Sequence, residues 1–244
     1  MNDAAESRNP EGLAADIAAR LRDAIMAGDL ASDERLPGEQ ELAERYGVSR
    51  PTVREALKRL AAQNLIRSRR GPTGGTFVNK ISWGEAHESL ATLSMLVVGM
   101  QGADPAQIIE ARLALLKTCV PFAVKKHRNP HLERMRAEAA AQRGDALSDE
   151  DFCASDVRFH RALADATGNP VLAFQMAGVV EGMQPLLNMI TYRARDREMI
   201  ADGHEAIADA VEARDAAAAI AALERLGAYV SGLTEGLLVR KEKA

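Results

Sequence analysis

Strand-like patterning occupies one short stretch of this 244-residue sequence, residues 64–78, and helical periodicity surrounds it on both sides. Within it, residues 64–68 and 76–78 suggest two strands, and the glycines and proline at 71–75 suggest the turn between them. Ahead of it, apolar spacing predicts helices over 12–28, 39–46 and 49–63. Three short helices followed by a β-hairpin are the element order of a winged helix-turn-helix domain.

From about residue 89 onward, the sequence predicts helices alone, because apolar side chains recur at helical spacing and the breaks contain Gly, Asp and Pro. The expected spans are 88–100, 104–127, 130–143, 148–167, 170–194, 197–213 and 215–239. The predicted fold is mainly α, with an N-terminal winged helix-turn-helix that carries a small β-hairpin wing and a C-terminal antiparallel all-α bundle. The expected boundaries are 1–78 for the first domain, 79–88 for a linker and 89–244 for the second domain.

Charge is distributed unevenly along the chain. Residues 35–80 carry ten Lys or Arg against four Asp or Glu, a formal +6, whereas the whole chain carries −4. A basic module on an acidic body suggests that one end of the molecule meets a polyanion. Chance clustering of surface charge explains this pattern equally well, so charge alone does not decide.

The segment 41–57 has the apolar spacing of two crossing helices. Gly47 permits the left-handed backbone of a tight turn, Ser49 can cap the next helix, and Pro51 is tolerated in its first turn. A plain helical hairpin has the same spacing, so the exposed face of the third helix separates the two. We interpret that face as a DNA-reading surface with donors for base edges and phosphates, presented by Ser49, Arg50, Thr52, Arg54, Lys58 and Arg59, with Arg67, Arg69 and Arg70 on the wing.

The runs 36–44 and 47–57, with the wing that ends at 74–78, resemble the signature of the GntR family. The helical C-terminal half resembles the FCD-type effector domain of the FadR subfamily. The resemblance implies DNA contacts from the start of the third helix and from the wing tip, together with the second-helix position where the family has Arg and this chain has Gln40. The DNA-binding candidates are Gln40, Ser49, Arg50, Pro51, Thr52, Arg54, Arg70 and Gly71.

Asp156 and His160 stand four residues apart on a predicted helix and therefore share one face, and His204 is a third candidate ligand downstream. By spacing alone, such an Asp–His pair is as readily an ion pair as a metal site. The resemblance implies one divalent cation, such as zinc or nickel, held by one Asp and three His. Leu226 stands where the third His is expected. The prediction is a cation on Asp156, His160 and His204, with a water or effector oxygen completing the shell.

Arg112 matches a family Arg that points into the effector cavity and pairs with an acidic ligand, although Leu116 stands where the family has Glu. The alternative is a structural salt bridge with Glu110 or Asp156. We expect a small organic acid effector, bound by Arg112 together with Asp156, His160 and His204. The cluster Tyr192, Arg193 and Arg195 borders the cavity or forms a solvated helix end, and His87, His127 and His131 are expected at the surface.

The sequence as a whole predicts a transcription regulator, a repressor, that binds a palindromic double-stranded DNA operator as a homodimer and is not an enzyme. The N-terminus has no apolar core of the signal-peptide kind, the run at 93–100 is short of a membrane span, and two cysteines lack ligand spacing, so a cytoplasmic protein is expected. One alternative is a metal-dependent hydrolase or lyase on Asp156, His160 and His204, for which no general-base motif is present. Another is an architectural DNA-coating protein, against which the acidic body argues.

Overall fold

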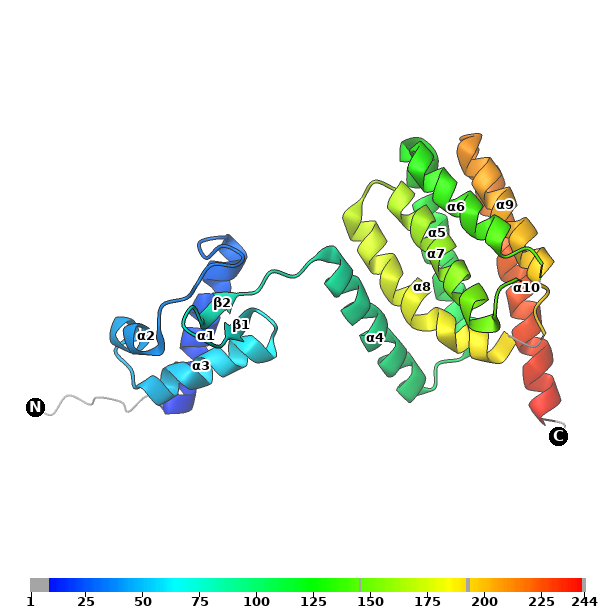
Figure 1. Ribbon diagram of the computed structural model, residues 1–244. Coiled ribbons are helices and arrows are strands. Elements are labelled where there is room, and N and C mark those ends of the chain that lie inside the picture. Colours follow the sequence, from blue (N-terminus) through cyan, green and yellow to red (C-terminus); the bar gives the residue numbers. More distant parts are fainter. Residues whose placement is uncertain (1–8, 145, 192–193, 243–244) are drawn as a thin grey trace, which may run out of the picture. The chain divides into compact units, whose positions relative to one another are not determined.

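The computed structural model describes residues 9–144, 146–191 and 194–242, and the chain forms two compact units that divide between Ile81 and Ser82 (Figure 1). The first unit contains α1 (Pro10–Ala27), α2 (Glu39–Tyr46), α3 (Arg50–Ala62), β1 (Ile66–Arg69) and β2 (Gly75–Val78). The second contains α4 (Trp83–Gln101), α5 (Pro105–Lys126), α6 (Asn129–Ala141), α7 (Asp149–Ala166), α8 (Pro170–Thr191), α9 (Arg197–Glu212) and α10 (Ala216–Glu242). The predicted fold class is confirmed by this order of elements.

One apolar core holds the three helices of the first unit to the wing. α1 begins where the Asn9 side chain accepts from the Glu11 N–H, and it ends at Gly28 in a left-handed conformation. The core includes Ala14, Ile17, Leu21, Leu36, Leu42, Val53, Ala56, Leu60, Ile66 and Val78. Because α2 and α3 both bury one face in this core, their crossing is fixed and the opposite face of α3 is exposed.

The wing is a two-stranded antiparallel hairpin in which Ile66 pairs with Val78 and Arg69 with Gly75. Residues 35–36 lie along β2 on the wing. Arg35 forms an isolated antiparallel β-bridge with Phe77, and the Leu36 N–H donates to the Thr76 oxygen at 2.8 Å. The sequence did not predict this segment. It ties the loop before α2 to the wing.

The second unit begins with α4 at Trp83, so the linker expected over 79–88 is wrong for most of its length. The Ser82 side chain accepts from the Glu85 N–H while the Glu85 carboxylate accepts from the Ser82 N–H, a reciprocal cap that starts the helix early. Polar residues in the first turns of the helix mask its helical signal in the sequence. The cap, rather than apolar spacing, sets the boundary.

The helices of the second unit form a bundle in which α5 packs against α7, α8, α9 and α10. α4 lies at one edge, beside α8 (Figure 1). Small residues allow this close approach, since a Cβ added at Gly182 would lie 2.6 Å from the backbone oxygen of Ala91. The main core includes Leu116, Val120, Met135, Phe152, Phe159, Leu163, Ile207, Val211 and Leu223. Polar side chains of α5, α7 and α9 are buried within it.

One stretch of α10, Ala216–Gly236, is long and apolar enough by length and composition to cross a membrane. In the fold, this helix packs against α5 and α9 and buries Ala219, Ala222 and Leu223 in the core. Core helices of soluble bundles can have the same length and composition, so these two properties are weak evidence for a membrane span.

Candidate functional site

The turn between α2 and α3 has the geometry that the sequence predicted. Gly47 adopts φ 64°, and the Ser49 side chain accepts from the Thr52 N–H at 3.3 Å to cap α3. Thr52, expected on the exposed face, is instead buried, with its hydroxyl 2.8 Å from the Ser49 oxygen. That expectation is wrong because the residue three positions after the cap turns inward to pack under it.

The exposed face of α3 presents two guanidinium groups beside one carboxylate. Arg54 donates to both oxygens of Glu39, at 3.0 and 2.7 Å, and Arg50 lies 3.8 Å from the same carboxylate. The hydrogen bond from Arg54 holds the pKa of Glu39 below its usual range. Gln40, on the first turn of α2, donates to Glu44 at 2.7 Å. The two arginine side chains are more than half exposed, so they are held at the surface and available to acceptors on a ligand.

The wing tip is a tight turn that brings backbone close to backbone. Gly71 adopts φ 107°, and a Cβ added at Gly74 would lie 2.5 Å from the Arg69 oxygen and 2.8 Å from the Gly71 oxygen. Arg70, beside this turn, is exposed. Arg67 pairs with Asp33 instead. Arg69 is exposed too, but its guanidinium carbon lies 5.2 Å from the centre of the Phe77 ring, so Arg70 is the wing arginine best placed to reach a ligand from the tip.

In the second unit, three helices bring four polar side chains into the interior: Arg112 from α5, Asp156 and His160 from α7, and His204 from α9. Ligand atoms of the Asp and the two His all lie within 4.8 Å of one another. Oδ1 of Asp156 lies 3.4 Å from Nε2 of His204, while Oδ2 accepts from Nη2 of Arg112 at 2.9 Å. The structure thus assembles all the residues that the sequence named for an effector or metal site.

Hydrogen bonds fix which nitrogen of each imidazole carries the proton. His204 Nδ1 lies 2.6 Å from Oε1 of Gln142, and His160 Nδ1 lies 2.9 Å from the backbone oxygen of Asp156. Both oxygens only accept, so each Nδ1 donates and each Nε2 keeps a lone pair. Within the described chain, Nε2 of His204 is buried with no hydrogen-bond partner. A lone pair that faces a carboxylate in a buried site is stabilised by a cation between them, so the donor set fits a divalent metal.

Burial and charge keep these groups in the forms that bind a cation. Burial lowers the pKa of His160 to about 3, and the charge of Arg112 acts in the same direction. Burial likewise lowers the pKa of His204 to about 4. Burial acts to raise the pKa of Asp156, but the neighbouring positive charge, first that of Arg112, outweighs it and the pKa falls. At neutral pH the cluster offers two neutral imidazoles and a carboxylate.

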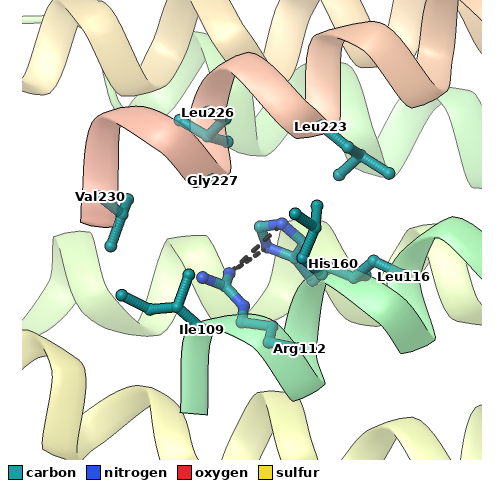
Figure 2. Close-up of a pocket in the computed structure, with 9 residues that line it drawn as sticks. Ile109, Arg112, Leu116, His160, Leu223, Leu226, Gly227 and Val230 are labelled. Atoms are coloured by element: carbon teal, nitrogen blue, oxygen red, sulfur yellow. Dashed lines mark hydrogen bonds between the residues drawn. The ribbon is translucent and has the colours of Figure 1, made fainter. Parts of the chain in front are cut away.

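Two small pockets adjoin the cluster, and Arg112 lines both. The first, in Figure 2, places Arg112 and His160 among the apolar residues Ile109, Leu113, Leu116, Leu223, Leu226, Gly227 and Val230. The second is more polar and is lined by Arg112, Phe152, Asp156, Gln184, Leu187, Thr191, Arg195, Ile200, Leu226, Val230 and Leu233. Each has a cavity volume of about 30 Å³, room for about one or two water molecules.

Leu226 lines both pockets beside Arg112. A Cβ added at Gly203 would lie 3.2 Å from Cδ1 of Leu226, so the leucine packs on α9 one residue before His204. The position where the resemblance expects a third His therefore lies next to the cluster. It supplies hydrocarbon in place of a ligand atom.

The structure answers the question that the sequence left open about the partner of Arg112. The guanidinium forms a buried salt bridge with Asp156, whereas Glu110 is exposed. Its Nη2 also lies 3.0 Å from Nδ1 and 3.3 Å from Nε2 of His160. Because that Nδ1 donates to the backbone, Nε2, the farther of the two nitrogens, is the one with a lone pair toward Arg112.

Sequence reasoning missed Gln142, whose amide orients His204 and itself donates to the Ser155 hydroxyl at 3.1 Å. No local signal pointed to it, because it lies 62 residues from His204. Arg195 does border a pocket, while Tyr192 and Arg193 lie outside the described residues. A further correction concerns two histidines expected at the surface, which are buried: His87 and His131.

Both units match known protein families. The family model "Bacterial regulatory proteins, gntR family" matches residues 13–78, and the "FCD domain" model matches residues 107–228. The "Putative L-lactate dehydrogenase operon regulatory protein" of Escherichia coli (strain K12) is 31% identical over 220 residues, 85% of this chain and 80% of that protein. The chain belongs to the GntR family.

Other relatives agree with this assignment. The "HTH-type transcriptional regulator LutR" of Bacillus subtilis (strain 168) is 30% identical to this GntR-family chain over 205 residues, 82% of this chain and 90% of LutR. The solved structure of Streptococcus agalactiae GntR shares the fold, with a TM-score of 0.60 at 20% identity over 91% of this chain and 99% of that one. The protein is a GntR-type transcription regulator with an FCD domain, not an enzyme, and regulators of this type bind DNA operators.

Proposed function

We propose that this GntR-family regulator is a repressor of the FadR subfamily whose operator affinity is controlled by a small carboxylate bound in the helical unit. The observation that carries the effector half is the buried cluster of Asp156, His160 and His204, in which an unpartnered imidazole nitrogen faces a carboxylate. Repression is supported by the "HTH-type transcriptional repressor NanR" of Cronobacter sakazakii (strain ATCC BAA-894), which is 28% identical over 208 residues.

DNA binding is assigned to the α2–α3 turn, the exposed face of α3 and the wing tip. Arg50 and Arg54 share the Glu39 carboxylate, and on DNA they would exchange it for phosphate oxygens or base acceptors. The N-terminal end of α3, capped by Ser49, adds the positive end of a helix dipole. The proposed DNA-contacting residues are Gln40, Ser49, Arg50, Pro51, Arg54, Arg70 and Gly71.

Effector binding is assigned to the interior of the bundle. One divalent cation such as zinc or nickel would be held by Asp156, His160 and His204, and when bound it supplies a positive centre that attracts a carboxylate oxygen. Leu226 leaves one coordination position for water or for that oxygen. Arg112 supplies a second positive group for the same ligand. L-Lactate is the first carboxylate to test, because the relative described above is named "Putative L-lactate dehydrogenase operon regulatory protein".

We propose that the chain forms a homodimer whose interface is the outer face of α4. Leu93, Leu96, Val97 and Met100 follow helical spacing and are 60%, 49%, 59% and 81% exposed. The other face of this helix packs against α8. A second copy of the chain is the occupant that we assign to this stripe. One recognition helix per chain reads too few base pairs, so two copies on a palindromic operator, in the cytoplasm, supply specificity.

The test is a gel-shift titration on an operator selected from random duplex DNA by the wild-type protein. A triple charge reversal, Arg50→Glu, Arg54→Glu and Arg70→Glu, is expected to abolish the shifted band. The matched control is Arg22→Glu, an exposed arginine of α1 that pairs with its neighbour Asp23. Undiminished binding by the triple variant would overturn the DNA-binding surface.

A thermal-shift screen of small organic acids, with and without Zn²⁺ or Ni²⁺, tests the effector. A ligand that binds only the native state raises Tm. We expect a rise with a carboxylate that disappears in Asp156→Asn. A screen in which no acid raises Tm, with either metal or without, would count against this effector class.

A further inference from the structure

Arg112 and a divalent cation need the same two side chains. Nη2 of Arg112 donates to Oδ2 of Asp156 at 2.9 Å and lies 3.3 Å from Nε2 of His160. These are the carboxylate and one of the two lone pairs that a metal would use. The His204 lone pair, 3.4 Å from Oδ1 of Asp156, is left unsatisfied in the described chain. The guanidinium of Arg112 therefore holds two of the contacts that a cation at this cluster would need.

Arg112 also limits the space for an effector. It lines both pockets together with Leu226 and Val230, and each pocket has a volume of about 30 Å³. A carboxylate with several carbon atoms needs more room than either pocket offers, since each has space for about one or two water molecules. Figure 2 shows the guanidinium turned toward His160. Ligand entry therefore requires side chains that line the pockets, Arg112 among them, to move.

We propose that Arg112 is an internal competitor of the metal and that cation binding at Asp156, His160 and His204 releases its guanidinium to grip the carboxylate effector. This proposal rests on the cation site proposed above. A metal takes up the lone pair of His160 and most of the charge of Asp156, so the guanidinium keeps too little counter-charge and needs another anion. Metal and carboxylate then raise each other's affinity, since coupling between two ligands is reciprocal.

Charge accounts for the direction of this coupling. Without a metal, Asp156 and Arg112 cancel, the two imidazoles are neutral, and the site has no net demand for an anion. A divalent cation leaves the buried site with a surplus of two positive charges. An isolated charge surplus in a buried site is costly, so an anion that neutralises it is bound more tightly. The occupant is therefore a carboxylate that binds well only after the metal.

The experiment measures Zn²⁺ binding by calorimetry for the wild type, Arg112→Met, Arg112→Lys and Asp156→Asn, each in metal-free buffer. Arg112→Met removes the competing charge at similar length, and we expect at least tenfold tighter Zn²⁺ binding. Arg112→Lys keeps a cation and is expected to bind Zn²⁺ much as the wild type does. L-Lactate affinity of the wild type is expected to rise at least tenfold with Zn²⁺, and Zn²⁺-loaded Arg112→Met is expected to bind L-lactate more weakly than the Zn²⁺-loaded wild type.

A second measurement follows Arg112 in the wild-type protein. In wild-type protein with ¹⁵N-labelled arginine, the side-chain signal of Arg112, identified by its loss in Arg112→Lys, is expected to move when Zn²⁺ saturates the site. If Asp156→Asn abolishes Zn²⁺ binding but the Arg112 signal of the wild type does not move when Zn²⁺ binds, the competition is overturned and the metal site stands. Equal Zn²⁺ affinity of the wild type and Arg112→Met has the same consequence. Zn²⁺ binding that Asp156→Asn leaves intact, or its absence in every variant, overturns the metal site itself.

Discussion

Acidification of the metal-free protein is expected to destabilise the helical unit through His160 and His204. An unfolded histidine takes up a proton near pH 6.5, whereas burial holds the pKa of these two at about 3 and about 4. Between these values the unfolded state binds more protons than the native state, so stability falls as pH falls. The stabilising effect of the neutral form is fully present above pH 6.5 and is lost below it.

The magnitude follows from the pKa shifts. At pH 5, each histidine is expected to lower the free energy of unfolding by about 2 kcal/mol relative to pH 8, and the pair by about 4 kcal/mol. That is a large part of the stability of an ordinary domain, which is about 5–15 kcal/mol. The Asp156 carboxyl, whose pKa lies below its usual value, does not titrate in this window.

Urea denaturation with a chelator present, at pH 8, 6.5 and 5, is the assay. Trp83, the single tryptophan, lies on α4 with its ring 5.9 Å from that of Phe174, so its fluorescence reports on the helical unit. His204→Asn is the matched variant, because it cannot titrate and is expected to lose about half of the pH dependence. Equal stability of the wild type at pH 8 and pH 5 would refute the reasoning that burial keeps both imidazoles neutral.

Three further outcomes are expected. Arg54→Ala is expected to cost about 1–3 kcal/mol in operator affinity, measured by fluorescence anisotropy, while Arg22→Ala on α1 leaves it unchanged; equal losses would remove Arg54 from the interface. Gly74→Ala is expected to lower the Tm of the first unit and weaken operator binding, because its Cβ would meet backbone oxygens at 2.5 and 2.8 Å, whereas Gly12→Ala has open space around it and serves as control. Val97→Glu on the outer face of α4 is expected to give a monomeric mass in light scattering with an unchanged circular dichroism spectrum; a persistent dimer would place the interface elsewhere.

The sequence by itself determined the order of the elements, because the signals that set them are local. A glycine at 47 with a capping serine at 49 specifies a turn between two helices whatever surrounds it. The period of apolar residues separates helix from strand in the same way, and the wing follows from two short runs and a glycine turn. Even the pairing of Asp156 with His160 on one helix face needed only their spacing.

Only the tertiary structure decided what lies beside what. Arg112 pairs with Asp156, 44 residues away, and not with Glu110, and Gln142 orients His204, 62 residues away. Helix packing brings together side chains that lie far apart in the sequence. Packing also turned Thr52 inward, against the helical pattern that placed it outside. Helical spacing fixes the face on which a side chain lies, but its partner and its protonation depend on burial, which is a property of the whole bundle.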